Sequence, residues 1–190
     1  MALLAIKTRK KYFKLLGFGE YNYASILKMQ KKYFHRAKDH DGLYGPDTDA
    51  LLRHLRNVKV FAPSFDPTEF RCPCGKCTGY PTRMKTKELK HIQAIRDHYK
   101  KPMVITSGLR CKAYNNSLKN SAKDSPHLHG YAVDFYMAGV TDTPERRAKT
   151  IEYIKTLRYH HYTYGNAVKD SNGNYINSPA MGNALHTDAR

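Results

Sequence analysis

Apolar residues recur at helical spacing through the first third of the chain. Residues 7–16 fit one helix, which Gly17 and Gly19 would end. A second helix is expected after Asn22, with lysines on its polar face. Its other face carries Ile26, Met29, Gln30, Tyr33 and Phe34, which recur at helical spacing. Pro46 suits the first position of a third helix, so we predict three helices before residue 60.

The rest of the chain mixes helical patterns with alternating ones. Helices are predicted over residues 85–101, ended by Pro102, and after the N-cap Thr143, which Pro144 follows. Four strands are predicted: a short buried one at residues 103–106, and others at residues 131–136, 162–168 and 183–188. The last two flank an Asn- and Gly-rich hairpin at residues 170–174. This order indicates an α+β fold, with an antiparallel sheet and helices packed to one side.

A change of composition suggests where the chain divides. Residues 61–67, FAPSFDP, contain two prolines and are typical of a linker or a domain entry. We therefore predict a small helical domain at residues 1–59 and a larger α+β domain at residues 60–190.

The chain of 190 residues carries a formal charge of +17. The excess is spread over both parts, with 13 basic and 5 acidic residues up to Lys59 and 20 basic and 11 acidic residues after it. Such a charge predicts a polyanionic partner, either nucleic acid or an anionic cell wall.

The N-terminal stretch MALLAIKTRKK is a poor match to a signal peptide, because its apolar run is short and its basic residues follow that run. No stretch approaches the roughly 20 apolar residues of a membrane span. We expect a protein made in the cytoplasm of the producing cell, with no membrane span.

The stretch DSPHLHGYAVDFY, residues 124–136, carries the strongest candidate chemistry. In an alternating strand, Val133 and Phe135 face one side and Asp134 the other. Asp is depleted in strands, so Asp134 needs a reason to be there. Imidazole and carboxylate together are normal ligands of catalytic zinc, which keeps three protein ligands and one open position. His127 and Asp134 are two candidate ligands, and His186 is the best candidate for the third.

Three elements of the sequence resemble one enzyme family. Residues 125–134, SPHLHGYAVD, are similar to the Ser-x-His-x-x-Gly-x-Ala-x-Asp motif of zinc D-Ala-D-Ala carboxypeptidases and related murein endopeptidases, whose wider group includes the hedgehog signalling domain. Residues 107–110, SGLR, resemble the Ser-Gly-Tyr-Arg element of the family, and residues 186–188, HTD, its terminal His-x-Asp. The resemblance implies a zinc peptidase with His127, Asp134 and His186 as ligands.

The resemblance also implies roles for nearby residues. Arg110, and with it Ser107 and Ser125, would bind substrate, and Arg110 would also stabilise an oxyanion. Asp188 shares a strand face with His186, so it is either the general base or the partner that orients a ligand histidine. In the vancomycin-resistance branch the base is a Glu three residues before the last ligand. Here that position is Asn183, so Asp124, His129 and Glu69 are further candidates.

The N-terminal part resembles a second family. Leu27-x-x-Gln30, followed by Asp41-Gly-x-x-Gly45-Pro-x-Thr48, is similar to the three-helix peptidoglycan-binding domain often fused to lytic enzymes. The alternative is a plain helical hairpin with a Gly-Pro turn, and the second glutamine usual in that family is missing.

Four cysteines remain: Cys72, Cys74, Cys77 and Cys111. They could be reduced thiols, form a disulfide after release from the cell, or hold a second, structural zinc. Because Cys111 directly follows Arg110, the cluster is expected to brace the active-site loop. The spacing leaves all three alternatives open.

Three functions are compatible with these observations: a zinc peptidase acting on peptidoglycan stem peptides, a zinc-containing cell-wall binding protein without turnover, and a basic nucleic-acid binder. The third has only the charge in its favour, since no nucleic-acid-binding motif is present. We predict the first: a monomeric zinc metallopeptidase of the phage endolysin type, which acts on the cell wall after release and has peptidoglycan as its partner.

Overall fold

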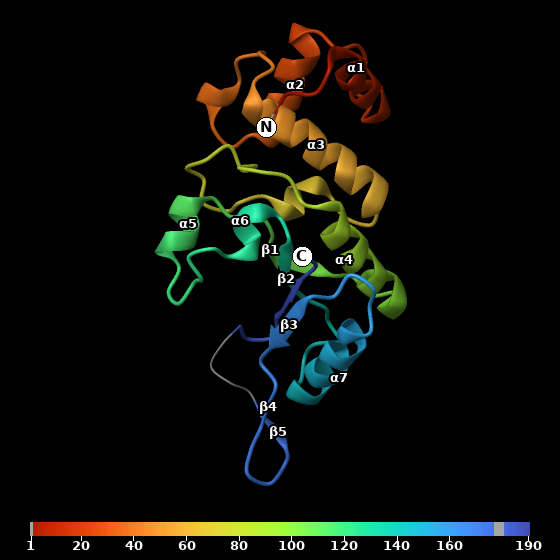
Figure 1. Ribbon diagram of the computed structural model, residues 1–190, viewed down its shortest axis with the longest axis vertical. Coiled ribbons are helices and arrows are strands. Elements are labelled where there is room, and N and C mark those ends of the chain that lie inside the picture. Colours follow the sequence, from red (N-terminus) through yellow and green to blue (C-terminus); the bar gives the residue numbers. More distant parts are fainter. Residues whose placement is uncertain (1, 177–180) are drawn as a thin grey trace.

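The computed structural model describes residues 2–176 and 181–190. At one end of the molecule lie three helices (Figure 1). They are α1 (Ile6–Leu15), α2 (Tyr23–Tyr33) and α3 (Pro46–Phe61), with a short 3-10 helix, η1 (Ala37–Asp39), before α3. The side chain of Asn22 caps α2 by accepting from the backbone N–H of Ser25, and Pro46 occupies the start of α3. These three helices are therefore where the sequence predicts them.

The remaining elements form an α+β arrangement, as predicted. The helices are η2 (Pro67–Phe70), α4 (Thr86–Tyr99), α5 (Lys112–Ser117), α6 (Pro126–His129) and α7 (Pro144–Lys155). The strands are β1 (Val104–Ser107), β2 (Ala132–Tyr136), β3 (Tyr162–Gly165), β4 (Val168–Lys169), β5 (Tyr175–Ile176) and β6 (Leu185–Asp188). Thr143 caps α7, with Pro144 after it, as the sequence predicts.

The central sheet is antiparallel, with the strand order β1-β2-β6-β3. Within the described residues, β4 and β5 pair only with each other, and they form a hairpin that projects from the end opposite α1 (Figure 1). The predicted strand over residues 162–168 is thus divided between the central sheet and this hairpin.

The two faces of the sheet have different neighbours. On one face, Val133 and Phe135 of β2 are fully buried, and Thr187 of β6 contacts His91 of α4 through a 2.8 Å hydrogen bond. α4 and α7 lie on this side (Figure 1). The short α6 lies against the other face, which carries Asp134 and His186.

The strand predicted as buried at residues 103–106 is an edge strand instead. Val104 is 43% exposed and the burial along β1 alternates, because in the described part of the sheet β1 pairs only with β2. Its β-branched composition alone does not distinguish an edge strand from a central one.

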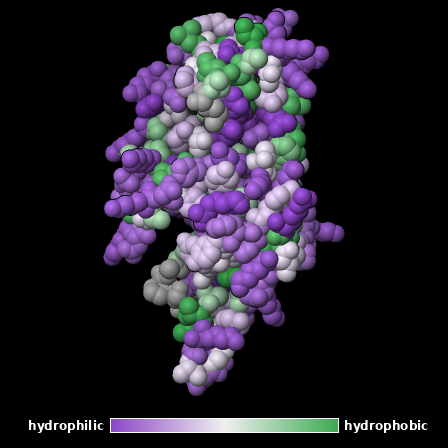
Figure 2. Space-filling model, viewed as in Figure 1, coloured by the Kyte–Doolittle hydropathy of each residue, from purple (hydrophilic) through white to green (hydrophobic). Residues whose placement is uncertain are grey.

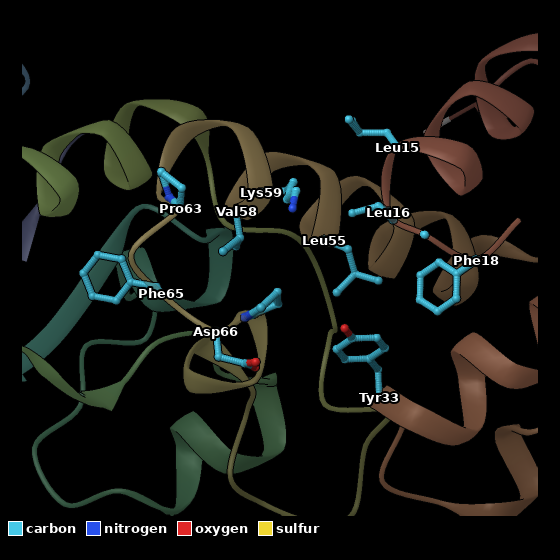
Figure 3. Close-up of a pocket in the computed structure, with 12 residues that line it drawn as sticks. Leu15, Leu16, Phe18, Tyr33, Leu55, Val58, Lys59, Pro63, Phe65 and Asp66 are labelled. Atoms are coloured by element: carbon cyan, nitrogen blue, oxygen red, sulfur yellow. The ribbon is translucent and has the colours of Figure 1, made fainter.

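The apolar core runs without a break from the N-terminal helices to the sheet. It includes Phe13 of α1, Leu52 of α3, Ile92 of α4 and Leu185 of β6. A cavity of about 450 Å³ lies where α1, α3 and the segment leading to η2 meet, and Phe18, Tyr33 and Phe65 are among the side chains that line it (Figure 3). α3 also continues to Phe61, past the predicted boundary at residue 59. The division into a binding part and a cleaving part stays a prediction.

Hydrophilic side chains cover most of the visible face of the molecule (Figure 2). In the part of the chain that the structure describes, no helix has the length and apolar character needed to cross a membrane.

A buried carboxyl group predicts an unusual dependence of stability on pH. Glu88 of α4 is 0% exposed. Burial, and next the nearby charge of Asp188, raise the pKa of Glu88 well above its ordinary value. Above the pKa that Glu88 has in the unfolded chain, the unfolded chain releases a proton that the folded protein keeps. The free energy of unfolding therefore falls by about 1.4 kcal/mol for each pH unit in this range.

Glu88→Gln keeps the shape of the side chain and removes its charge. We therefore expect the free energy of unfolding of this variant not to fall with rising pH in the same way. Urea unfolding of both proteins between about pH 5 and pH 7 measures it, and the variant should gain stability over the parent as the pH rises. Glu152→Gln is the matched control, because the Glu152 side chain on α7 is 71% exposed. A parent and a Glu88→Gln variant with parallel profiles would contradict the expectation.

Candidate metal centre

A row of four side-chain positions crosses the sheet on the face opposite α4. The strand register places Ser107 of β1 beside Asp134 of β2, Asp134 beside His186 of β6, and His186 beside Tyr164 of β3. Directly paired residues in an antiparallel sheet have Cβ atoms about 4.5–5.5 Å apart. Pairing alone therefore brings together a carboxylate and an imidazole that are 52 positions apart in the sequence.

His127 reaches this row from α6, a single turn that begins at Pro126 and ends at Gly130. Gly130 has φ of +73°, and a Cβ there would collide with the backbone carbonyl of Arg83. Only glycine meets both conditions without strain. The turn after Gly130 leads directly into β2, which fixes His127 above Asp134.

The three predicted ligands converge at buried atoms. His127 Nε2 lies 3.3 Å from both His186 Nδ1 and Asp134 Oδ1, and His186 Nδ1 lies 2.7 Å from the same Asp134 oxygen. Two ligands each about 2.0 Å from a tetrahedral zinc are about 3.3 Å apart, so the two sides of the triangle that meet at His127 have the length that zinc requires, and the side of 2.7 Å between His186 and Asp134 is shorter. Two nitrogens and a carboxylate oxygen are also the donor types that zinc prefers. The residues present therefore fit a zinc ion with three protein ligands.

Neighbouring groups orient both histidines for this role. The carbonyl of Gly108 accepts a 2.7 Å hydrogen bond from Nδ1 of His127, which leaves the lone pair of Nε2 facing the centre. Asp188 Oδ2 lies 3.7 Å from Nε2 of His186 and favours a proton on that nitrogen, which leaves Nδ1 facing the centre. Partners of this kind fix the tautomer and the ring orientation of metal-binding histidines.

The electrostatics of the three groups are strongly linked. Burial alone would raise the pKa of Asp134, but the adjacent imidazoles of His127 and His186 bring that pKa well below its ordinary value. Burial lowers the pKa of His127, although the adjacent Asp134 carboxylate opposes this. Burial also acts to lower the pKa of His186, but Asp134 and Asp188 together raise it. Asp134 is therefore ionised in the folded protein and available as a cation ligand.

Arg110 is tied to the outer oxygen of the same carboxylate. Its Nη2 lies 2.6 Å from Asp134 Oδ2, and its Nε donates a 2.9 Å hydrogen bond to Ser107 Oγ. These contacts use two of the five N–H donors of the guanidinium. Ser107, predicted to bind substrate, thus holds Arg110 in place.

Asp188 is buried at the C-terminal end of β6, with its side chain 1% exposed. Besides His186, it contacts His161 Nδ1 at 3.0 Å and the Arg190 guanidinium at 3.2 Å. Burial opposes ionisation, but His186 and Arg190 lower the pKa of Asp188. This environment favours a fixed carboxylate that orients His186.

A cleft of about 520 Å³ opens over the three convergent residues. Ser125 and Arg110 line it, as do Tyr162, Tyr164 and the loop of residues 118–122. Tyr164 stacks on His186 with ring centroids 4.7 Å apart. Tyr164 is not identified by sequence reasoning, because its place follows from the β3–β6 register; its spacing of two residues from Tyr162 in a predicted strand was the available sign. Figure 2 shows a hollow on this side of the molecule.

The other candidate bases have structural partners elsewhere. Asn183, at the position of the glutamate in the vancomycin-resistance branch, accepts a 3.0 Å hydrogen bond from the buried Arg147. Glu69 accepts from the backbone N–H of Asp66 and caps η2. Asp124 pairs with His129 on an exposed surface. Asp188 is the only carboxylate of these that lines the described part of the cleft.

A family model for peptidase M15 matches residues 63–167, which is more than half of the chain. The chain belongs to the peptidase M15 family. This family consists of zinc-dependent peptidases, so the fit of zinc to the three convergent residues agrees with the family. No curated protein and no solved structure matches the chain.

The matched range of the M15 peptidase includes Arg110, His127 and Asp134 but ends before His186 and Asp188. The placement of those last two residues beside the others therefore comes from the geometry of β6. The three N-terminal helices also lie outside the matched range.

Proposed function

We propose that this M15 peptidase hydrolyses peptide bonds in peptidoglycan stem peptides, with one zinc ion held by His127, Asp134 and His186. The observation that carries the proposal is the triangle of donor atoms, 2.7–3.3 Å apart, at the floor of an open cleft. Three protein ligands and an open side are the arrangement of catalytic zinc sites, whereas structural sites are closed.

The lining of the cleft supports an anionic peptide as substrate. Arg110, Lys119 and Arg190 contribute positive charge to it, and Tyr162 and Tyr164 are 53% and 43% exposed. Stem peptides carry free carboxylates, and a guanidinium binds a carboxylate through paired hydrogen bonds. The net charge of +17 would also concentrate the enzyme on an anionic wall.

When bound, zinc supplies a Lewis acid and lowers the pKa of a bound water toward about 7. The residues of the chain orient the metal ligands and bind the charges of the substrate. Gly108 and Asp188 fix the two imidazoles, and Ser107 fixes Arg110. The N–H groups of Arg110 that neither Ser107 nor Asp134 uses would donate to the charge that develops on the scissile carbonyl, or to a substrate carboxylate.

Asp188 is proposed to act through His186 rather than on the substrate. Its oxygen Oδ2 lies 3.7 Å from Nε2 of His186, and Arg190 and His161 contact the same carboxylate, whose side chain is 1% exposed. Asn183 is engaged with Arg147 and carries no basic group, so it does not accept a proton in the reaction.

Mass spectrometry of muropeptides after digestion of purified sacculi tests the function directly. Loss of terminal D-Ala would indicate a carboxypeptidase, and cleavage of cross-links or of the L-Ala–D-Glu bond an endopeptidase. Intact muropeptides after prolonged digestion with zinc-loaded enzyme would refute peptidase activity.

The N-terminal helices are proposed to bind the wall. The motif that resembles a peptidoglycan-binding domain forms a partly buried network: the Gln30 side chain donates to Asp41, Leu43 and Thr48 and accepts from the N–H of Gly42. This network fixes the loop after η1 above a cavity of about 460 Å³. Leu43, at the rim of that cavity, is 63% exposed.

We predict that Leu43→Glu in the full chain weakens binding to intact sacculi by about tenfold to a hundredfold, since burial of a leucine contributes about 1.5–3 kcal/mol. Hydrolysis of soluble muropeptides should stay unchanged. Ile6→Glu, at a position 59% exposed on α1, is the control with the same change of charge. Equal loss of sacculus pull-down in both variants would show that net charge, and not this loop, binds the wall.

The combination of a wall-cleaving and a wall-binding part supports a phage endolysin. Co-expression in the host with a membrane-permeabilising partner tests this, since lysis should require both proteins. Lysis by the partner alone, at an undiminished rate, would speak against the role.

One observation favours a second candidate, a wall-binding protein without turnover. Asn183 replaces the basic group that the vancomycin-resistance branch uses, and its amide is committed to Arg147. Such a protein would bind muropeptides with zinc present and leave them intact, so the digestion experiment separates the two functions.

A further inference from the structure

The four cysteines converge at a second place, remote in the sequence from the histidines of the cleft. Their Sγ atoms all lie within 4.8 Å of one another, although Cys111 is 39 positions from Cys72. The sulfur of Cys74 lies 3.4 Å from that of Cys77 and 3.7 Å from that of Cys111. These separations exceed the roughly 2.0 Å of a disulfide bond. They approach the 3.8 Å or so expected between two thiolates about 2.3 Å from a tetrahedral zinc.

The surrounding backbone is arranged to stabilise negative sulfur. Each sulfur accepts one backbone N–H at 3.3–3.4 Å. The donors are Lys76 for Cys74, Gly79 for Cys77, Cys111 for Cys72, and Tyr114 for Cys111. Hydrogen bonds to the charged form favour that form, and the thiolate is the form that binds metal.

The loop that carries the first three cysteines has the shape of a metal-binding turn. Cys74 and Cys77 enclose Gly75, whose φ of +65° lets the chain reverse between two ligands. Cys111 enters from another segment, as the N-cap of α5. Four ligands from two segments leave no open position, which is the arrangement of a structural site.

We propose that Cys72, Cys74, Cys77 and Cys111 bind a second zinc ion with a structural role. This ion would close a loop between the segment after η2 and the segment that carries Arg110. The same region is linked to the N-terminal helices, since His35 donates to the carbonyl of Cys72 at 2.9 Å and Arg36 to that of Lys76 at 2.8 Å. The ion therefore holds together three parts of the chain that meet beside the cleft.

The position of Arg110 gives the proposed ion a consequence for the cleft. Arg110 directly precedes Cys111, and its N–H donates to the carbonyl of His127 at 3.2 Å. The neighbouring Leu109 donates to Phe70 of η2 at 2.8 Å. A rigid Cys111 fixes the backbone from which the guanidinium reaches Asp134.

Metal content and the cobalt(II) spectrum test the proposal. The parent protein should bind two zinc ions, and both Cys74→Ser and His127→Ala should bind one. Cobalt-loaded parent and His127→Ala should show thiolate-to-cobalt charge-transfer absorption, which Cys74→Ser should lose. Cys77→His keeps a zinc ligand and should retain two ions with an altered cobalt spectrum, which separates loss of a ligand from misfolding.

Unmodified protein gives an independent measurement. A thiol reagent should release one zinc ion as the four cysteines react. The thiols should react slowly while the ion is bound. Parent protein with a single zinc that His127→Ala loses and Cys74→Ser keeps, four freely reactive thiols in the zinc-loaded state, or a disulfide in the intact mass would each overturn the proposal. None of these outcomes would affect the proposed peptidase function, because that rests on His127, Asp134 and His186.

Discussion

His127→Ala and His186→Ala are each expected to abolish hydrolysis of muropeptides. Each change removes one of three donor atoms that lie 2.7–3.3 Å apart, and two remaining ligands do not hold zinc tightly. The effect should be the largest of any single substitution in the chain, because the Lewis acid and the activated water are lost together. Elemental analysis after mild chelation, beside the digestion assay, measures both consequences.

His129→Ala is the matched control for these variants. His129 lies two positions after His127 in the same short helix, but its side chain is 53% exposed and pairs with Asp124. It should keep full zinc content and activity. Combining each histidine variant with Cys74→Ser removes the contribution of the cysteine cluster to the metal count. Full zinc in both double variants would show that His127 and His186 are not ligands.

The elements that local chemistry determines could be predicted from the sequence. Asn22 and Thr143 cap the helices after them, and Pro46 begins α3, because each acts on backbone groups within three or four residues. The α+β class followed from the order of helical and alternating patterns. His127, Asp134 and His186 could be nominated from residue type and from the family resemblance.

The contacts that depend on strand register could not be predicted. Tyr164 reaches His186 only because β3 pairs with β6 in one particular register, and no local pattern fixes that register. The exposure of Val104 depends in the same way on the absence of a second neighbour for β1 in the described sheet. For the same reason, the partners of Asn183 and Glu69 became known only from the structure.

The cysteines lie between these two cases. The spacing of Cys74 and Cys77 is typical of one metal-binding turn, but the sequence offered no second turn of that kind. The fold supplies the missing ligands singly, Cys72 from the same loop and Cys111 from the start of α5. Convergence from separate segments is a property of tertiary structure, so the three alternatives for these residues stayed open at the level of sequence.

Arg110 is predicted to have the second-largest effect on turnover. Ser107 and Asp134 hold the guanidinium at the rim of the cleft, and its other N–H donors are available to a developing oxyanion or a substrate carboxylate. Loss of one such group typically lowers turnover by about a hundredfold to a thousandfold. Arg110→Lys should lose most of the contribution of Arg110 to turnover, because an ammonium keeps the charge beside Asp134 but lacks the planar arrangement of donors of a guanidinium. kcat/KM for a soluble muropeptide, measured with zinc in excess, gives the effect.

Asp188→Asn provides the contrast that identifies what Arg110 does. Because Asp188 Oδ2 faces Nε2 of His186, its loss should weaken zinc affinity by about tenfold to a hundredfold, and excess zinc should restore much of the activity. Excess zinc should not restore Arg110→Lys, since all three metal ligands remain in that variant. If Asp188→Asn keeps normal zinc affinity but loses activity together with the acid limb of the pH–rate profile, Asp188 is the general base instead. If zinc rescues Arg110→Lys, then Arg110 acts by positioning Asp134 and not by contacting the substrate.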